Sequence, residues 1–139
     1  MKKTLLVLIL SVSFIFISCN EYVGGVRVGN NMESYALSYI ENHEILSPYE
    51  KILAYYDYTI SLDGTTAAII TNDRLIFHNQ DTKTTYFYLE DITKIKHYKK
   101  VMEGFFIEVW KGTELMMINI APLNDANIFL DVLESNTDL

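Results

Sequence analysis

The sequence is short of the residues and motifs that disulfide bonding and catalysis require. Only one of its 139 residues is cysteine, at position 19, so an intramolecular disulfide cannot form. The three histidines, His43, His78 and His97, do not have the spacing of a metal-binding helix. A glycine-rich phosphate loop and a G-x-S-x-G motif are also absent. We therefore expect that the protein is not an enzyme and that it uses no cofactor and no metal ion.

Basic residues are scarce as well. The chain has 11 lysines and arginines against 18 aspartates and glutamates, which gives a net charge of −7. Lys2 and Lys3 belong to a targeting segment, and without them nine basic residues face 18 acidic ones, a net charge of −9. A negative field of this size opposes binding to nucleic acid and to anionic lipid. We expect no nucleic-acid partner.

The densest basic cluster consists of Lys94, Lys96, Lys99 and Lys100. In a strand, alternation places Lys94 and Lys96 on one face and Lys99 on the other. The cluster is a candidate contact with an anionic lipid surface. The alternative, which we favour, is a solvated edge strand whose lysines discourage pairing with a second sheet.

The longest hydrophobic run lies at the N-terminus. It extends from Leu5 to Ile17, follows Lys2 and Lys3, and is followed by the small residue Ser18, which is the layout of an export signal. As a helix its residues would span ~20 Å, less than the ~30 Å of the hydrocarbon core of a bilayer. We therefore predict a signal peptide in residues 1–18 rather than a transmembrane helix.

The sole cysteine follows this run directly. The segment Phe16-Ile17-Ser18-Cys19 resembles the lipobox of bacterial lipoproteins, which implies that Cys19 becomes the first residue after cleavage and carries fatty acyl chains such as palmitate. The alternative is an ordinary secretory signal that leaves a free thiol. We favour the lipoprotein, because two or three acyl chains anchor a protein stably. We expect it at the bacterial cell envelope, in the outer membrane if the bacterium is Gram-negative.

A short connecting segment follows the predicted anchor. Residues 19–30 contain three glycines and no helical period, which predicts a flexible linker. Val23, Val26 and Val28 leave a second interpretation open, namely an edge strand added to a sheet.

An amphipathic helix is predicted next, in residues 31–47. Apolar and aromatic side chains recur there at i, i+3, i+4 and i+7, and Asn30 is the expected N-cap. The helix should end before Pro48, because the residue before a proline avoids the helical region.

Residues 48–139 have the pattern of a mostly β domain of the α+β class. Asp63-Gly64 is a tight-turn dipeptide, and it predicts an antiparallel hairpin between the first two strands. Seven strands are predicted: 51–62, 66–71, 74–78, 84–89, 92–98, 105–110 and 114–120. After Pro122, apolar residues recur at helical spacing at Ala126, Phe129, Leu130 and Leu133. We predict a small antiparallel seven-stranded barrel with the C-terminal helix capping one open end.

Four segments of this region resemble the bacterial PH-like and GRAM-like domains. They are Glu50–Leu53, Thr71–Phe77, Leu89–Ile95 and the helix Asn124–Ser135. The resemblance implies a PH-like fold for residues 48–139 and a non-catalytic binding or scaffolding module. Phosphoinositide-binding PH domains hold the head group with basic residues of the first hairpin, but residues 61–66 contain no basic residue and one aspartate. We therefore expect no phosphoinositide binding.

Two functions are open for such a domain. The first is binding of a protein or peptide partner, through a sheet edge or the groove beside the C-terminal helix. The second is transport or sensing of a small apolar or lipid ligand in the barrel mouth, which requires an internal pocket lined by tyrosine and phenylalanine. Trp110, Phe106 and Tyr55 are candidates for an exposed aromatic face, with core packing as the alternative. Asp57, which interrupts a strand, has no evident role.

Overall fold

The computed structural model describes residues 24–139. The predicted signal peptide, Cys19 and the first part of the predicted linker lie outside the described residues. The strands are β1 (Arg27–Val28), β2 (Ile52–Asp57), β3 (Thr66–Thr71), β4 (Arg74–Asn79), β5 (Thr85–Tyr88), β6 (Lys94–Lys100), β7 (Gly104–Lys111) and β8 (Glu114–Ile120). The helices are α2 (Ser34–Asn42), the 3-10 turn η1 (Leu89–Asp91) and α3 (Ala126–Ser135). Within the described residues, no helix has the length and apolar character needed to cross a bilayer.

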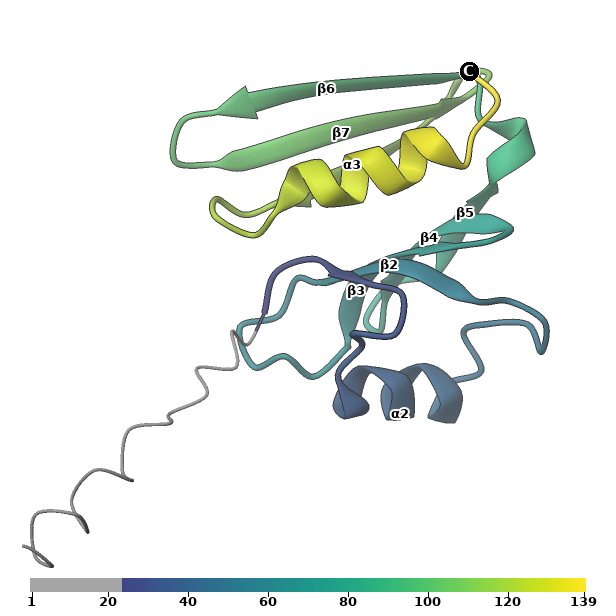
Figure 1. The fold of residues 1–139 in the computed structure, drawn as a ribbon, viewed down its shortest axis with the longest axis vertical. Coiled ribbons are helices and arrows are strands. Elements are labelled where there is room, and N and C mark those ends of the chain that lie inside the picture. The colour runs from purple at the N-terminus through teal and green to yellow at the C-terminus, as the bar shows by residue number, and fades with distance from the viewer. Residues whose placement is uncertain (1–23) are drawn as a thin grey trace, which may run out of the picture.

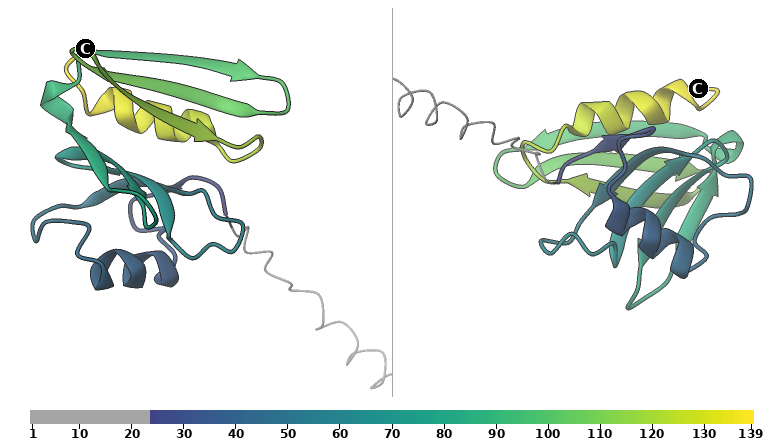
Figure 2. Two further views of the ribbon diagram at one scale, coloured as in Figure 1. Left: turned by 180° about the vertical axis from the view of Figure 1, so that it is seen from behind. Right: turned by 60° about the horizontal axis from the view of Figure 1, so that its bottom comes forward.

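The strands form two antiparallel sheets that face each other (Figure 1). The strand order is β1-β2-β3-β4-β5 in the first sheet and β6-β7-β8 in the second. Helix α3 lies between the sheets on the side of β2, and α2 covers the opposite face of the five-stranded sheet (Figures 1 and 2). The predicted α+β class and the antiparallel order of consecutive strands are confirmed.

Two parts of the predicted fold are wrong. The described residues contain eight strands rather than seven, because Arg27–Val28 pairs with Tyr55 and Ala54 as an edge strand, the interpretation that the valine pattern had left open. The sheets also do not close into a barrel. The chain passes from one sheet to the other through η1, and no ladder in residues 24–139 joins β5 to β8.

Several element ends differ from the sequence pattern. Strand β2 stops at Asp57, so Asp63-Gly64 belongs to a loop of residues 58–65 instead of a two-residue turn. Helix α2 begins at Ser34 with Glu33 at the N-cap position, and the Glu33 carboxylate accepts a hydrogen bond from Arg27 Nη2 at 2.8 Å. This ion pair fixes β1 to the start of the helix. At the other end, Glu44 has a φ of 49°, which stops helical growth.

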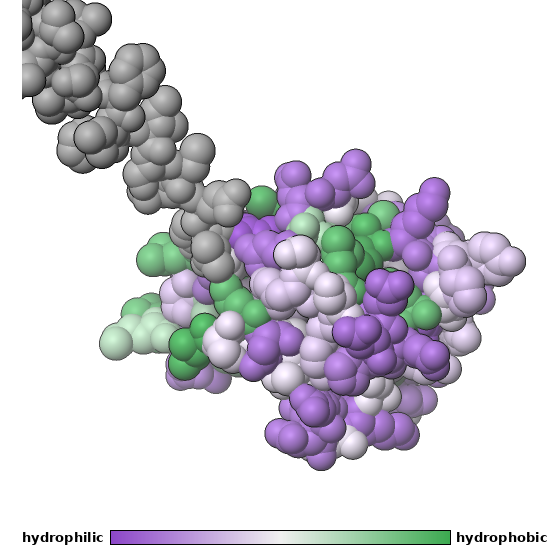
Figure 3. Space-filling view, turned by 90° about the horizontal axis from the view of Figure 1, so that it is seen from below, coloured by the Kyte–Doolittle hydropathy of each residue, from purple (hydrophilic) through white to green (hydrophobic). Residues whose placement is uncertain are grey.

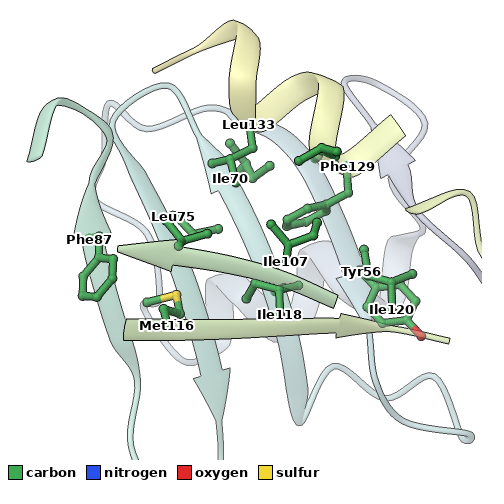
Figure 4. Packing of buried hydrophobic residues seen from close by; sticks show 14 of the residues in the cluster. Tyr56, Ile70, Leu75, Phe87, Ile107, Met116, Ile118, Ile120, Phe129 and Leu133 are labelled. Carbon is green, nitrogen blue, oxygen red and sulfur yellow. The ribbon is translucent and has the colours of Figure 1, made fainter. Parts of the chain in front are cut away.

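The core has two parts, one on each face of the five-stranded sheet. Between the sheets, side chains from β3, β4, β7 and β8 meet those of α3; Ile70, Leu75, Ile107, Ile118 and Phe129 are among them (Figure 4). Under α2, a second cluster contains Ala36, Ile40, Tyr55, Ile69 and Ile76. Because both faces of β3 are covered, its sequence TAAIIT is apolar almost throughout instead of alternating.

Candidate functional site

The open side of the two sheets forms a groove between β5 and β8. Its volume is about 670 Å³. The lining residues, which define the β5–β8 groove, are Phe77, Lys83, Thr84, Thr85, Tyr86, Phe87, Glu114, Leu115, Met116 and Met117. Phe87 and Met116 are buried at its floor, where they point toward each other from the two strands (Figure 4). Tyr86, Leu115 and Met117 stay exposed.

The two strands that flank the groove are both sheet edges. In residues 24–139, β5 is paired only with β4, and β8 only with β7. An edge strand presents backbone N–H and C=O groups that a further strand can bind, while alternate side chains of that strand enter pockets. Lys83 and Glu114 give the lining one charge of each sign. The arrangement therefore suits an extended peptide better than a small polar molecule.

The four predicted surface lysines all lie in β6, but not on one face. Strand pairing sets Lys94 opposite Trp110, Lys96 opposite Glu108 and Lys100 opposite Gly104, on the face directed away from the core. Lys99 lies on the other face. The Lys100 ammonium is 3.2 Å from a carboxylate oxygen of Glu103. Part of the basic charge is therefore neutralised within the strand and its turn.

The proposed aromatic face is only partly present. Trp110 and Phe106 share the outer face of β7, where Phe106 stacks on Tyr98 with ring centroids 5.2 Å apart. Lys94 Nζ lies 5.5 Å from the centre of the Trp110 ring, a cation–π distance. Tyr55 is not part of this face, because it is buried in the other sheet beneath α2.

Asp57 proves to organise the loop that follows β2. Its carboxylate accepts hydrogen bonds from Tyr35 Oη (3.1 Å), Tyr55 Oη (3.3 Å), Thr59 N (2.7 Å) and Gly64 N (2.9 Å). Burial, together with the negative charge of Asp57, raises the pKa of both tyrosines. Their hydroxyls therefore stay protonated as donors. One sequence signal indicated this role, namely an aspartate in an apolar strand.

A second polar network joins two of the segments that carry the family resemblance. Arg74 Nε donates to Glu50 Oε1 at 2.8 Å, and Thr71 Oγ1 donates to the same oxygen at 2.9 Å. Arg74 Nη2 also reaches Ile45 O at 3.3 Å. We call Glu50, Thr71 and Arg74 the clasp. Burial raises the pKa of Glu50, but the hydrogen bonds from Arg74, Ser47 N and Thr71 outweigh burial, and the pKa falls to about 2.

The histidines do not meet at one site. His78 is buried, with Nδ1 2.8 Å from Thr84 Oγ1 and Nε2 3.1 Å from Tyr39 Oη. Burial and the nearby His43 lower its pKa. His97 lies in the three-stranded sheet, where it stacks on Phe105. Across residues 24–139, no three His, Cys, Asp or Glu side chains gather as a metal site.

Comparison with known proteins supports the architecture that carries the groove. A family model described as bacterial PH domain matches residues 46–135, a range that includes β2 to β8 and α3. The fold is similar to that of a DUF1696 family protein with a pleckstrin-homology domain from Shewanella loihica PV-4, with a TM-score of 0.55 and 14% identity; the match covers 76% of this chain and 99% of that chain. No curated protein matches the sequence.

Proposed function

We propose a binding function for this chain, which belongs to the bacterial PH domain family. It binds an extended segment of a partner protein in the β5–β8 groove, and it is lipid-anchored at the cell envelope. Domains of this family are in general binding or scaffolding modules rather than enzymes. The observation that carries the proposal is that, within residues 24–139, two sheet edges without a partner strand flank an apolar floor.

The partner segment is expected to be a strand with alternating side chains. Its backbone would pair with β5 or β8, and its apolar side chains would lie on Phe87 and Met116 at the floor. Tyr86 and Leu115 would flank the bound strand at the rim of the groove, because register with Ile76 and Trp110 places their side chains on the outer faces of the two sheets. Aromatic and methionine side chains are enriched at protein interfaces, and both types are present here.

The alternative function, a carrier of a small apolar ligand, has less support. The space between the sheets is occupied by a buried cluster that includes Ile70, Ile107, Ile118, Phe129 and Leu133. The groove is lined by phenylalanine and tyrosine and has the volume of a ligand site, but it is open to solvent along the strand edges. A partner strand would cover such an opening, whereas a small ligand would stay half exposed.

The location of the partner site is tested by photo-crosslinking in the bacterium that makes the protein. A photoreactive phenylalanine analogue replaces Tyr86 in the groove or, as the control, Tyr98 on the outer face of β6; both tyrosines are comparably exposed. We expect a discrete protein adduct from position 86 and none from position 98. Equal adducts from both positions, or none from position 86, would contradict the groove as the partner site.

Lipid anchoring is tested independently of the groove. We expect metabolic labelling with an alkyne fatty acid to mark the wild-type chain and to leave the Cys19→Ala chain unmarked, and the wild type alone to partition into detergent. Absence of label on the wild type would refute the anchor and leave the groove proposal standing. Cys19 is the only thiol in the chain, so a lipid attached through sulfur can be attached only there.

A further inference from the structure

Four almost fully exposed apolar side chains gather at one end of the domain. These residues, which we call the apolar tip, are Ile60 (104% exposed), Val101 (88%), Met102 (91%) and Leu123 (91%). They come from the β2–β3, β6–β7 and β8–α3 loops, which lie at the same end of the two sheets in every view (Figures 1 and 2). Single exposed apolar residues are ordinary on protein surfaces, but a cluster on neighbouring loops is not.

The three loops are fixed to one another. Gly104 has a φ of 114°, and a Cβ there would lie 2.4 Å from Ile120 O, so only glycine lets the β6–β7 turn approach the end of β8 this closely. Asn119 N donates to Tyr58 Oη at 3.1 Å, which joins the β2–β3 loop to the same strand. The loops that carry the apolar tip are therefore held together at the end of β8.

The backbone at the tip is unusual for residues of this size. Met102 and Leu123 have φ values of 67° and 66°, in the left-handed region that large side chains rarely adopt. Glycine or asparagine would occupy these positions with less strain. Large apolar side chains are instead held at the outermost points of two loops, which is a reason to look for a contact that they make.

The chain enters the domain beside this surface. Val26 N donates to Asn124 O at 3.1 Å in the β8–α3 loop, and a Cβ on Gly24 would lie 4.0 Å from the Leu62 side chain in the β2–β3 loop. Apolar surface is visible next to the point where the described residues begin (Figure 3). Cys19 precedes Gly24 by five residues, which span at most ~18 Å. Acyl chains on Cys19 would hold this end of the domain at the bilayer.

We propose that the apolar tip inserts into the bilayer interface and forms, together with lipidated Cys19, a two-point membrane contact that fixes the orientation of the domain. The proposal rests on the proposed anchor. Apolar insertion rather than charge drives this contact, because Glu103 pairs with Lys100 in the same turn. Asp63 and Asp125 also lie in the tip loops and give no attraction for anionic lipid.

The test uses the full chain, isolated from the membrane and reconstituted into vesicles. Met102→Cys places a thiol at the tip, and Tyr49→Cys, at a side chain that is 90% exposed but lies in the segment before β2, is the matched control. Each thiol carries an environment-sensitive fluorophore, and the lipids carry a quencher. We expect a blue shift and quenching at position 102 and no change at position 49. The result should be the same in phosphatidylcholine vesicles and in vesicles that contain phosphatidylglycerol.

The outcomes separate this inference from the lipid anchor. Equal emission from positions 102 and 49 on membrane-bound protein would overturn tip insertion and leave the anchor intact. A blue shift at position 102 only in vesicles that contain phosphatidylglycerol would overturn apolar insertion. Thiol labelling of the wild-type chain would show that Cys19 is free and would refute the anchor. The same probes in a Cys19→Ala background then decide the tip alone: a blue shift at position 102 supports insertion, and its absence overturns it. In the intact protein, Val101→Ser with Ile60→Ser should reduce quenching at position 102 on the order of tenfold.

Discussion

The space between the two sheets has two long sides, which we call the seams, and a described segment covers only one of them. On the side of β2, helix α3 fills the seam with Phe129, Leu130 and Leu133, all buried. On the side of β5 and β8 the buried Phe87 and Met116 form the floor, yet no described segment covers the β5–β8 groove. One seam therefore stabilises the fold by burying apolar area within the chain. The other keeps apolar surface and strand edges available for a second molecule, so residues at the two seams should respond differently to substitution.

The largest effect is expected at the sealed seam. Phe129→Ala removes a ring that is fully buried between the sheets, and the cavity adds to the lost burial. The free energy of unfolding should fall by ~3–5 kcal/mol, as measured by urea denaturation. Because α3 is remote from the groove floor residues Phe87 and Met116, crosslinking at position 86 should survive in the fraction that stays folded. A loss below ~1 kcal/mol would show that α3 does not seal the core.

The clasp should stabilise the fold in a way that depends on pH, unlike the apolar seam. The hydrogen bonds of the clasp lower the pKa of Glu50 from the ordinary 4.5 of a glutamate to about 2 in the folded state, so the clasp stabilises the fold above about pH 4.5 and loses its contribution as the pH falls toward 2. Glu50→Gln should cost on the order of 2–3 kcal/mol at neutral pH and almost nothing at pH 2. The measurement is the unfolding free energy of both chains across this range.

The control for the clasp is Glu103→Gln. It breaks the exposed pair with Lys100, in which both side chains are about half accessible. Exposed pairs contribute ~0–1 kcal/mol, so this variant should differ little from wild type at neutral pH. A pH-independent loss in Glu50→Gln would mean that the carboxylate acts only by filling space.

The sequence predicted local features well and long-range ones poorly. Alternation and turn residues placed the strands Thr66–Thr71 and Glu114–Ile120 at their observed bounds, because each depends on its own residues. The same alternation carried the first strand to Leu62, five residues too far. Thr59 and Gly64 donate their backbone N–H groups to Asp57, and this side-chain competition with the ladder leaves no trace in hydrophobic periodicity.

Contacts between distant segments of the chain are not contained in sequence patterns. The clasp joins Glu50 to Arg74, and Tyr56 Oη accepts a hydrogen bond from Ala121 N, 65 positions later. Glu50 and Arg74 lie in two segments that carry the family resemblance, but no pattern indicates that these two side chains meet. The groove is a property of two edges from separate sheets. The predicted closed barrel contains no such groove, because closure of a barrel pairs every strand edge.

A smaller effect on stability is expected at the groove floor. Met116→Ala removes a buried side chain, but at the edge of the core, where solvent enters the vacated space. The expected loss is ~2 kcal/mol, at the low end for a methionine truncation and below that of Phe129→Ala. Urea denaturation of the two variants in parallel tests the comparison. A loss equal to that at Phe129 would mean that the second seam is packed as tightly as the first.

The smallest change in stability should accompany the largest change in binding. Leu115→Glu in the groove and Leu37→Glu on α2 alter side chains of the same type that are both 45% exposed. Each should change the unfolding free energy by no more than ~0.5 kcal/mol, since neither is in the core. Only Leu115→Glu should abolish the adduct from position 86, because a carboxylate cannot be desolvated against an apolar partner without cost. If Leu37→Glu abolishes the adduct as well, the partner surface extends over α2; if Leu115→Glu leaves it intact, the open seam is not where the partner binds.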